Sequence, residues 1–178
     1  MKVLVEHGAD IYNHNKVFVN VLHLAVMRNH IQIVKMLVQS EFPLDLETED
    51  GMTALHLAAL LSHTEIAELI INTLMEGTYK QNYVKKSISK LNSLTNMSPL
   101  SLSILIQNKE IASKLITSNA KCYYADSFIQ RDLSPIFLAC DNENTDLLEL
   151  MCDHEAQLNV KNSLGQTPLM FASQQRKQ

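Results

Sequence analysis

The sequence predicts an all-α solenoid in which helix–turn–helix units stack side by side and are joined by loop or hairpin fingers. Three observations indicate this. A short phrase recurs five times along the 178 residues, a second apolar pattern recurs in step with it, and both patterns are displaced by the same insertions. A fixed spacing of this kind is typical of one supersecondary unit copied along a chain. Each copy buries its apolar face only by stacking on its neighbours.

The recurring phrase contains a polar residue, two residues later an aliphatic one, and then a helical apolar pattern. Its aliphatic residues are Leu22, Leu55, Leu100, Ile136 and Leu169. They lie 33, 45, 36 and 33 residues apart. The second pattern is centred on Leu4, Leu37, Ile70, Leu115 and Met151, with steps of 33, 33, 45 and 36. Both patterns therefore place twelve extra residues before Leu100 and three before Ile136.

Each unit is expected to contain two helices. The Thr53 hydroxyl can cap the first helix of its unit by accepting a backbone N–H that has no partner within the helix. The next position holds Ala54 or a proline, and proline fits the first turn of a helix. The second helices carry apolar stripes at helical spacing over residues 33–38 and 66–71.

These motifs resemble the ankyrin repeat. The helix-start phrase of that family is matched at residues 53–56 and 167–169, and its Gly-Ala-Asp helix ending at residues 8–10. The turn glycine that precedes the threonine is matched by Gly51 and Gly165. The resemblance extends over nearly the whole chain, although the third and fourth complete copies are degenerate.

The resemblance implies one array over residues 1–178. Its units are a partial repeat at 1–12, a repeat at 13–45, a repeat at 46–91 with an insertion at about 74–90, degenerate repeats at 92–127 and 128–160, and a partial repeat at 161–178. The partial units at the ends lead us to expect a segment of a longer array.

The turn between the two helices of each repeat departs from the family. Glycine is usual there, because the backbone adopts a left-handed conformation. This chain has Asn29, Ser62, Gln107 and Glu143 at those positions. Asparagine tolerates the conformation better than the other three. We therefore expect an array less stable than one with consensus turns, with its weakest part in the third and fourth repeats.

The histidines and cysteines do not form a recognisable metal site. The resemblance implies that His23 and His56 bind neighbouring loops through hydrogen bonds, and they occur once per repeat, so they should not converge. The sequence contains no Cys-x-x-Cys or His-Glu-x-x-His pattern. Its three cysteines are widely spaced and are expected to be free thiols in a reducing compartment. We expect neither a metal nor another cofactor.

Composition and motifs argue against several other classes of function. The net charge of −4 does not favour a nucleic-acid partner. No apolar run approaches the roughly 18 residues that cross a bilayer, so membrane insertion is not expected. We find no nucleophile elbow, phosphate-binding glycine loop or kinase motif, and so we do not expect an enzyme. A cytoplasmic or nuclear location is expected.

The first candidate site for a partner is the concave side that an array of this family presents. The residues expected there in the second and third repeats are apolar: Met52, Leu60, Leu61, Met97, Leu105 and Ile106. A contiguous exposed apolar patch is typical of a binding surface, and methionine suits an adaptable one. The alternative is that these side chains pack against adjacent repeats.

The insertion is the second candidate site. Gly77 is expected to end the preceding helix. Five lysines and no acid lie between Gly77 and Lys109, in a chain that is acidic overall. Such a run produces a local positive field that could meet an acidic segment. The residues singled out are Tyr79, Tyr83, Lys85 and Lys86, with the tyrosines, Ile88 and Leu91 expected in a short helix on the array. The alternative is a solvated basic loop.

The expected function is a non-catalytic interaction module, an adaptor or scaffold that binds a protein or peptide. This follows from the resemblance. Two alternatives stay open: a regulatory ankyrin domain of a larger channel, ligase adaptor or signalling protein, and a protein similar to the ankyrin inhibitors of the NF-κB pathway. The sequence leaves the oligomeric state open.

Overall fold

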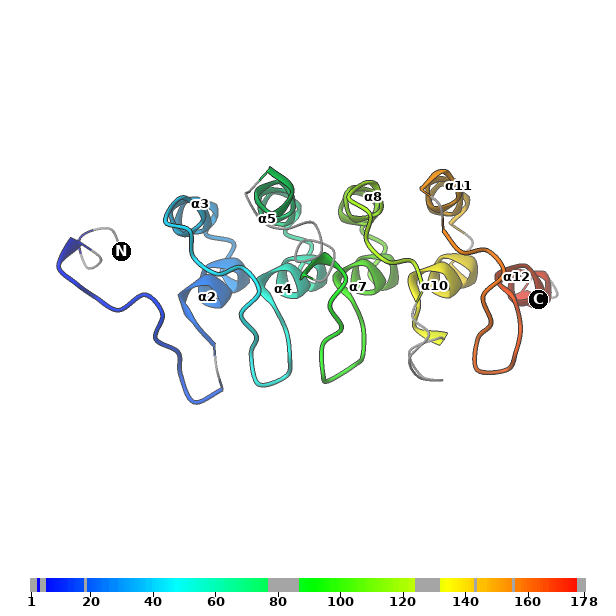
Figure 1. Ribbon diagram of the computed structural model, residues 1–178, viewed down its shortest axis with the longest axis horizontal. Coiled ribbons are helices and arrows are strands. Elements are labelled where there is room, and N and C mark those ends of the chain that lie inside the picture. The colour runs from blue at the N-terminus through cyan, green and yellow to red at the C-terminus, as the bar shows by residue number, and fades with distance from the viewer. Residues whose placement is uncertain are drawn as a thin grey trace.

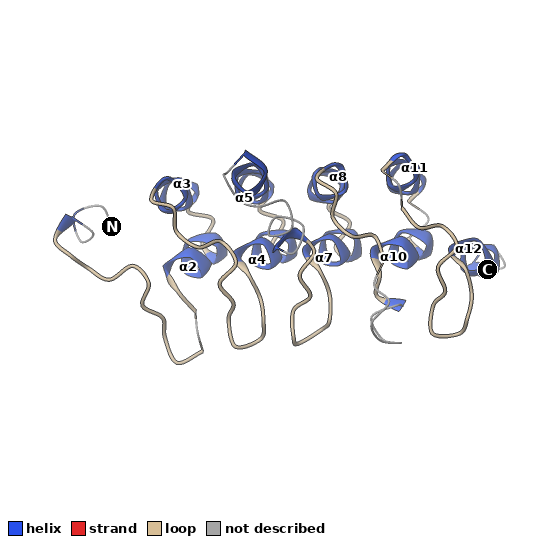
Figure 2. Cartoon of the chain, in the orientation of Figure 1, coloured by secondary structure: helices blue, strands red, loops and turns tan. Residues whose placement is uncertain are grey.

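The computed structural model shows two parallel rows of helices, with loops that project from one side of the array (Figure 1). It describes residues 3, 6–17, 19–76, 87–123, 132–142, 144–154 and 156–175. Regular secondary structure in these segments is helical (Figure 2), apart from an isolated bridge between His14 and Asn20. The predicted all-α solenoid is therefore confirmed.

The first helices of the repeats form one row. They are α2 (Val21–Met27), α4 (Ala54–Leu60), α7 (Pro99–Leu105), α10 (Pro135–Asp141) and α12 (Pro168–Gln175). The second helices form the other row, as α3 (Ile31–Gln39), α5 (Thr64–Glu76), α8 (Lys109–Thr117) and α11 (Thr145–Asp153). Each first helix packs on the next one along its row, and the second helices do the same. The fingers lie on the side of the first row that faces away from the second row (Figure 1).

The helix starts follow the capping chemistry that the sequence predicts. Thr53 Oγ1 accepts the backbone N–H of His56, and Ser98 Oγ accepts that of Ser101. Proline is the first residue of α7, α10 and α12. Because these caps satisfy N–H groups that have no partner in the helix, they set where the first row begins.

The turns between paired helices have the expected left-handed backbone. The φ angles are +54° at Asn29, +56° at Ser62 and +61° at Gln107. Glu143, the fourth predicted turn residue, lies outside the described part of the chain. Non-glycine side chains are strained in this conformation, so the departures from family glycine occur where the backbone needs glycine most.

The core lies between the two rows. The aliphatic residue of the recurring phrase is at most 2% exposed in the four complete repeats, as shown by Leu22, Leu55, Leu100 and Ile136. Its equivalent in α12, Leu169, is 81% exposed. Within the described residues no second helix follows α12, which is where the partner of Leu169 would stand.

The fingers are held together by backbone hydrogen bonds. The N–H of Glu49 donates to the carbonyl of Val17 at 3.1 Å, and the N–H of Ser93 donates to that of Asp50 at 3.0 Å. At Gly51, φ is +71° and a Cβ atom would lie 2.6 Å from the backbone nitrogen of Ser93. Glycine is therefore required here both by conformation and by the close approach of the next finger.

Helix α5 is described as far as Glu76, and the predicted role of Gly77 in ending it lies outside the described residues. Residues 77–86 lie outside the described part, and with them Tyr79, Tyr83, Lys85 and Lys86. The chain then packs against the third repeat. Ile88 is fully buried, and Ser89 Oγ accepts the N–H of Lys121 at 2.9 Å.

Candidate partner-binding face

The first helices leave one face open on the finger side of the array. With about 3.6 residues per turn, positions four and seven after the N-cap share a face of the helix. At position seven, Met27 is 47% exposed, Leu60 44% and Leu105 52%. The second helices α3, α5 and α8 pack on α2, α4 and α7, and the exposure of these three side chains places them on the face that the second row leaves uncovered.

The residue after each of these helices widens the face in the middle of the array. Leu61 is 42% exposed and Ile106 is half-buried. We call the group the apolar row, and it consists of Met27, Leu60, Leu61, Leu105 and Ile106. In the fourth repeat the equivalent positions carry exposed polar residues, Asp141 and Asn142. The apolar row therefore extends over the first three complete repeats and ends at the fourth.

In the second to fourth repeats, leucines one helical turn earlier form the floor of this face, whereas their equivalent in the first repeat, Leu24, is 50% exposed. Leu57 and Leu138 are half-buried, and Leu102 is 4% exposed. These side chains contact the core on one side. The apolar row thus continues directly into the interior packing of the array, which limits the movement of its own side chains.

Met97 corrects the predicted membership of this face. Its side chain is only 5% exposed and belongs to the core. The finger folds back so that both the backbone N–H and the side-chain amide of Asn92 donate to the Met97 carbonyl, each at 3.0 Å. The neighbouring prediction, Met52, is half-buried and packs on the core. Two of the six predicted residues thus face mainly inward, because each directly precedes a buried N-cap residue.

Among the remaining predicted residues of the concave side, Leu60, Leu61 and Leu105 keep about half of their surface, and Ile106 is half-buried. The alternative, in which Leu60 and Leu105 are absorbed into contacts with adjacent repeats, does not agree with exposures of 44% and 52%. Whether a partner binds them stays a prediction.

The electrostatic character of the fingers varies from repeat to repeat. The tip of the second finger carries Glu49 and Asp50, both exposed. Their neighbours at the tips of the first and third fingers are Lys16–Val17 and Leu94–Thr95, and Leu94 is 68% exposed. The tips of the first three fingers are therefore partly apolar, with acidic residues on the middle one.

Two of the five lysines in the basic run have acidic partners in this chain. Lys90 Nζ contacts Glu47 Oε1, and Lys109 Nζ lies 3.0 Å from Asp146 Oδ2. Both pairs are partly or largely exposed. Lys90 thus joins the second finger to the chain that follows the insertion, and Lys109 joins α8 to α11.

His23 and His56 hold adjacent repeats together, as expected. The Nε2–H of His23 donates to the carbonyl of Leu46, and that of His56 donates to the carbonyl of Lys90, both at 3.0 Å. The Nδ1 atom of His56 accepts the N–H of Thr53 at 3.2 Å, which identifies the neutral form with hydrogen on Nε2. Burial lowers the pKa of His56 to about 4, against the opposing effect of the Lys90 carbonyl. Burial also lowers the pKa of His23.

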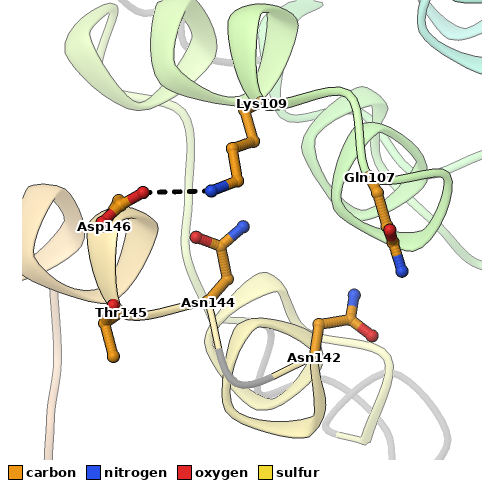
Figure 3. Close-up of a pocket in the computed structure, with 6 residues that line it drawn as sticks. All are labelled: Gln107, Lys109, Asn142, Asn144, Thr145 and Asp146. Carbon is orange, nitrogen blue, oxygen red and sulfur yellow. Dashed lines mark hydrogen bonds and ion pairs between the residues drawn. The ribbon is translucent and has the colours of Figure 1, made fainter.

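A polar cavity lies where the third and fourth repeats meet at the helix–helix turns (Figure 3). Its volume is about 260 Å³, and it is lined by Gln107, Lys109, Asn142, Asn144, Thr145 and Asp146. Several of its polar groups already serve the fold. Asn142 Nδ2 donates to the Ile104 carbonyl at 3.0 Å, and Asn144 caps α11. These contacts indicate that the cavity is part of the packing between the third and fourth repeats.

Burial makes two of the three cysteines weaker acids than a free thiol. All three are free, and burial raises the pKa of Cys122 to about 11. Burial and the neighbouring Cys152 raise the pKa of Cys140. Within the described segments, no group of three or more His, Cys, Asp or Glu residues is arranged to hold a metal ion. Over the same segments, no helix has both the length and the apolar character needed to cross a membrane.

Comparison with protein families agrees with the geometry. The family described as ankyrin repeats (3 copies) matches residues 1–81 and 100–178, which is most of the chain. The chain therefore belongs to the ankyrin-repeat family, whose members generally serve as protein–protein interaction modules. A comparison with curated proteins gives no match.

Proposed function

We propose that this array is a non-catalytic adaptor or scaffold that binds a protein or peptide against the uncovered face of its first helices. The observation that carries the proposal is the apolar row, in which three successive first helices each expose a large apolar side chain at the same position. A regular arrangement of this kind offers one contiguous surface, and contiguous exposed apolar surface is typical of interaction sites.

The physical basis is burial of an already ordered surface. Leu60 and Leu105 are anchored in helices whose other faces are buried, so a partner orders few groups when it binds. This lowers the entropic cost of association. A few residues that become fully buried near the centre of an interface generally contribute most of its affinity.

The inserted segment is proposed as a second contact, through Tyr79, Tyr83, Lys85 and Lys86. Its support is the local excess of lysine over acid in the sequence. Lys90 and Lys109 already contact carboxylates of the chain, so the charge available to a partner is proposed to come from residues 80–86. We further propose a cytoplasmic or nuclear location, which agrees with three free cysteines.

Affinity capture with matched variants tests the main proposal. The bait is the full chain, compared with the double variant Leu60→Glu/Leu105→Glu and with Leu158→Glu. Leu158 is the control because its exposed fraction, 48%, is similar to that of Leu60. It follows α11, near the other end of the array. We expect a partner that is retained by the wild type and by Leu158→Glu and is lost from the double variant.

Circular dichroism and thermal unfolding of each variant show whether the fold is kept. Partners that are retained equally by all three baits would contradict the proposal. Lys85→Glu/Lys86→Glu tests the insertion separately. If this variant binds the partner with unchanged affinity and unchanged salt dependence, the proposed contact through the insertion is wrong. The proposal for the apolar row would be unaffected.

A further inference from the structure

We infer that the occupant of the apolar row is an amphipathic α-helix, with apolar side chains seven residues apart and basic side chains on the flank that faces the finger tips. This inference rests on the proposed function and narrows it, since it names the secondary structure and the charge of the partner. It follows from the spacing of the apolar row and from the charge of the surfaces that border it.

The spacing is set by the packing of the first helices. Met27, Leu60 and Leu105 occupy the same position in α2, α4 and α7, which pack against one another in that order. Packed helices lie roughly 8–10 Å apart. The apolar row therefore offers one anchoring position about every 10 Å along the array.

An α-helix matches this interval. Seven helical residues rise about 10.5 Å and return to nearly the same face after two turns. Residues on one face of a β-strand recur about every 6.6 Å or 13 Å, and neither distance matches. A partner helix that follows the row thus meets Met27, Leu60 and Leu105 with residues i, i+7 and i+14, whereas a strand meets only one of them well.

The width of the apolar row also suits a helix. In the second and third repeats the apolar surface is two residues wide, formed by Leu60 with Leu61 and by Leu105 with Ile106. A helix fills such a surface with a stripe in which apolar residues alternate at intervals of three and four. A partner of this kind buries all four side chains, whereas a single line of anchors would leave Leu61 and Ile106 uncovered.

The charge of the partner follows from the bordering residues. Among the tips of the first three fingers, residues 16–17, 49–50 and 94–95, the charged side chains are Lys16, Glu49 and Asp50. All three are exposed. The positive residues of this face, Lys16 and the exposed Arg28 that follows α2, belong to the first repeat, so the second finger presents the carboxylates Glu49 and Asp50 at the centre of the row. The apolar row ends at Asp141, which is also exposed. Lysine or arginine on the finger-facing flank and beyond the last anchor would complement these carboxylates, and complementary charge favours both the encounter and the register of binding.

Selection from a peptide library tests this inference without a known partner. A displayed library of 22-residue peptides, randomised at every position, is selected on the full chain at about physiological ionic strength. We expect the enriched peptides to carry apolar residues at seven-residue intervals and a net positive charge. On binding, a synthetic copy should gain helical circular dichroism. Its affinity should fall at least tenfold against Leu60→Glu/Leu105→Glu and remain within twofold against Leu158→Glu.

The outcomes separate the two proposals. Peptides that bind the double variant as well as the wild type would overturn the proposed face itself. Peptides that depend on Leu60 and Leu105, but are proline-rich or lack a seven-residue period, would overturn only the helical partner. A polyproline helix is the relevant competitor, because its three-residue turn of about 9.3 Å also fits the spacing. Selected peptides with a net negative charge would overturn the proposed basic character of the partner. So would peptides whose affinity is unchanged by Glu49→Gln/Asp50→Asn.

Discussion

The Ser101 hydroxyl donates a 2.8 Å hydrogen bond to the backbone carbonyl of Leu133. The donor occupies the position of His56 one repeat earlier, but His56 donates to the carbonyl of Lys90, eight residues before the next N-cap, whereas Leu133 directly precedes its N-cap. The third repeat has lost the family histidine but keeps a contact with the next finger. In the fourth repeat the same position holds Phe137, whose ring packs edge-to-face on Phe171 at 5.8 Å. Three different chemistries thus connect successive repeats from one position.

Ser101→Ala should destabilise the array, because it leaves the Leu133 carbonyl without this donor in a partly buried site. The expected loss in the free energy of unfolding is about 1–2 kcal/mol. Urea denaturation of the full chain measures it. Ser40→Ala is the control, since Ser40 is exposed and its hydroxyl bonds only to its own helix. Equal effects of the two substitutions would show that the bond to Leu133 contributes nothing.

The stability of the array should fall as the pH falls from about 6.5 to about 4, because of His56. Its pKa is lowered in the folded state to about 4, whereas an unfolded histidine titrates near 6.5. Between these values the unfolded state binds more protons, so acid favours unfolding. Above about 6.5 neither state is protonated and the contribution is complete. The full effect of such a shift is about 3 kcal/mol.

Urea unfolding at a series of pH values from 7.5 to 4.5 tests this on the wild type and on His56→Gln. Protonation would place a hydrogen on Nδ1, which already accepts the N–H of Thr53. The variant should therefore show a flatter pH dependence than the wild type over the same window. Identical slopes in the two proteins would assign the acid sensitivity to other groups.

Gly51→Ala should disrupt the contact between the second and third fingers. Its positive φ costs about 1–2 kcal/mol for any L-residue, and the new Cβ would also collide with the backbone of Ser93. Gly165→Ala isolates the first effect, because φ there is +75° but nothing lies within 4 Å of the added atom. The midpoint of thermal unfolding should thus be lower for Gly51→Ala than for Gly165→Ala. The reverse order would contradict a steric role for Ser93.

Much of the fold is predictable because it depends on local chemistry repeated at a fixed interval. The polar cap, the following proline and the apolar stripe identify both helices of a repeat, and the first-row helices begin within one residue of those signals. The left-handed turns at Ser62 and Gln107 were predictable for the same reason, since the family places glycine there.

The direction of side chains in the fingers was harder to predict. Met97 was expected on the binding face, and it points into the core because Asn92 folds the finger back onto its carbonyl. The backbone part of this contact recurs in other fingers, where Thr48 and Asn162 donate to the carbonyls of Met52 and Gln166. The side-chain bond of Asn92 is the part that the repeat pattern does not signal.

The bond from Ser101 to Leu133 was not predicted. The available signal was the position of Ser101, three residues after its cap, from which His56 also donates to a backbone carbonyl further along the chain.

The strained turns predict that glycine would stabilise this array. Ser62→Gly and Gln107→Gly remove the steric cost of a positive φ, at +56° and +61°. Each should raise the free energy of unfolding by roughly 0.5–1 kcal/mol, after the entropic cost of glycine is deducted. Asn29→Gly should have a smaller effect because asparagine tolerates this region. The urea midpoints of the three variants rank these gains in stability. A larger gain from Asn29→Gly than from the other two would contradict the explanation that asparagine tolerates a positive φ.

The final prediction separates binding from folding at the apolar row. Leu61→Ser and Ile106→Ser remove side chains that are only partly buried, so each should lower the free energy of unfolding by less than about 1 kcal/mol. Leu100→Ala, at a fully buried position, should lower it by about 2–5 kcal/mol. If the row is a binding surface, the two serine variants weaken capture of a groove-dependent partner while the fold persists. A large loss of stability with unchanged binding would instead make Leu61 and Ile106 part of the packing between repeats.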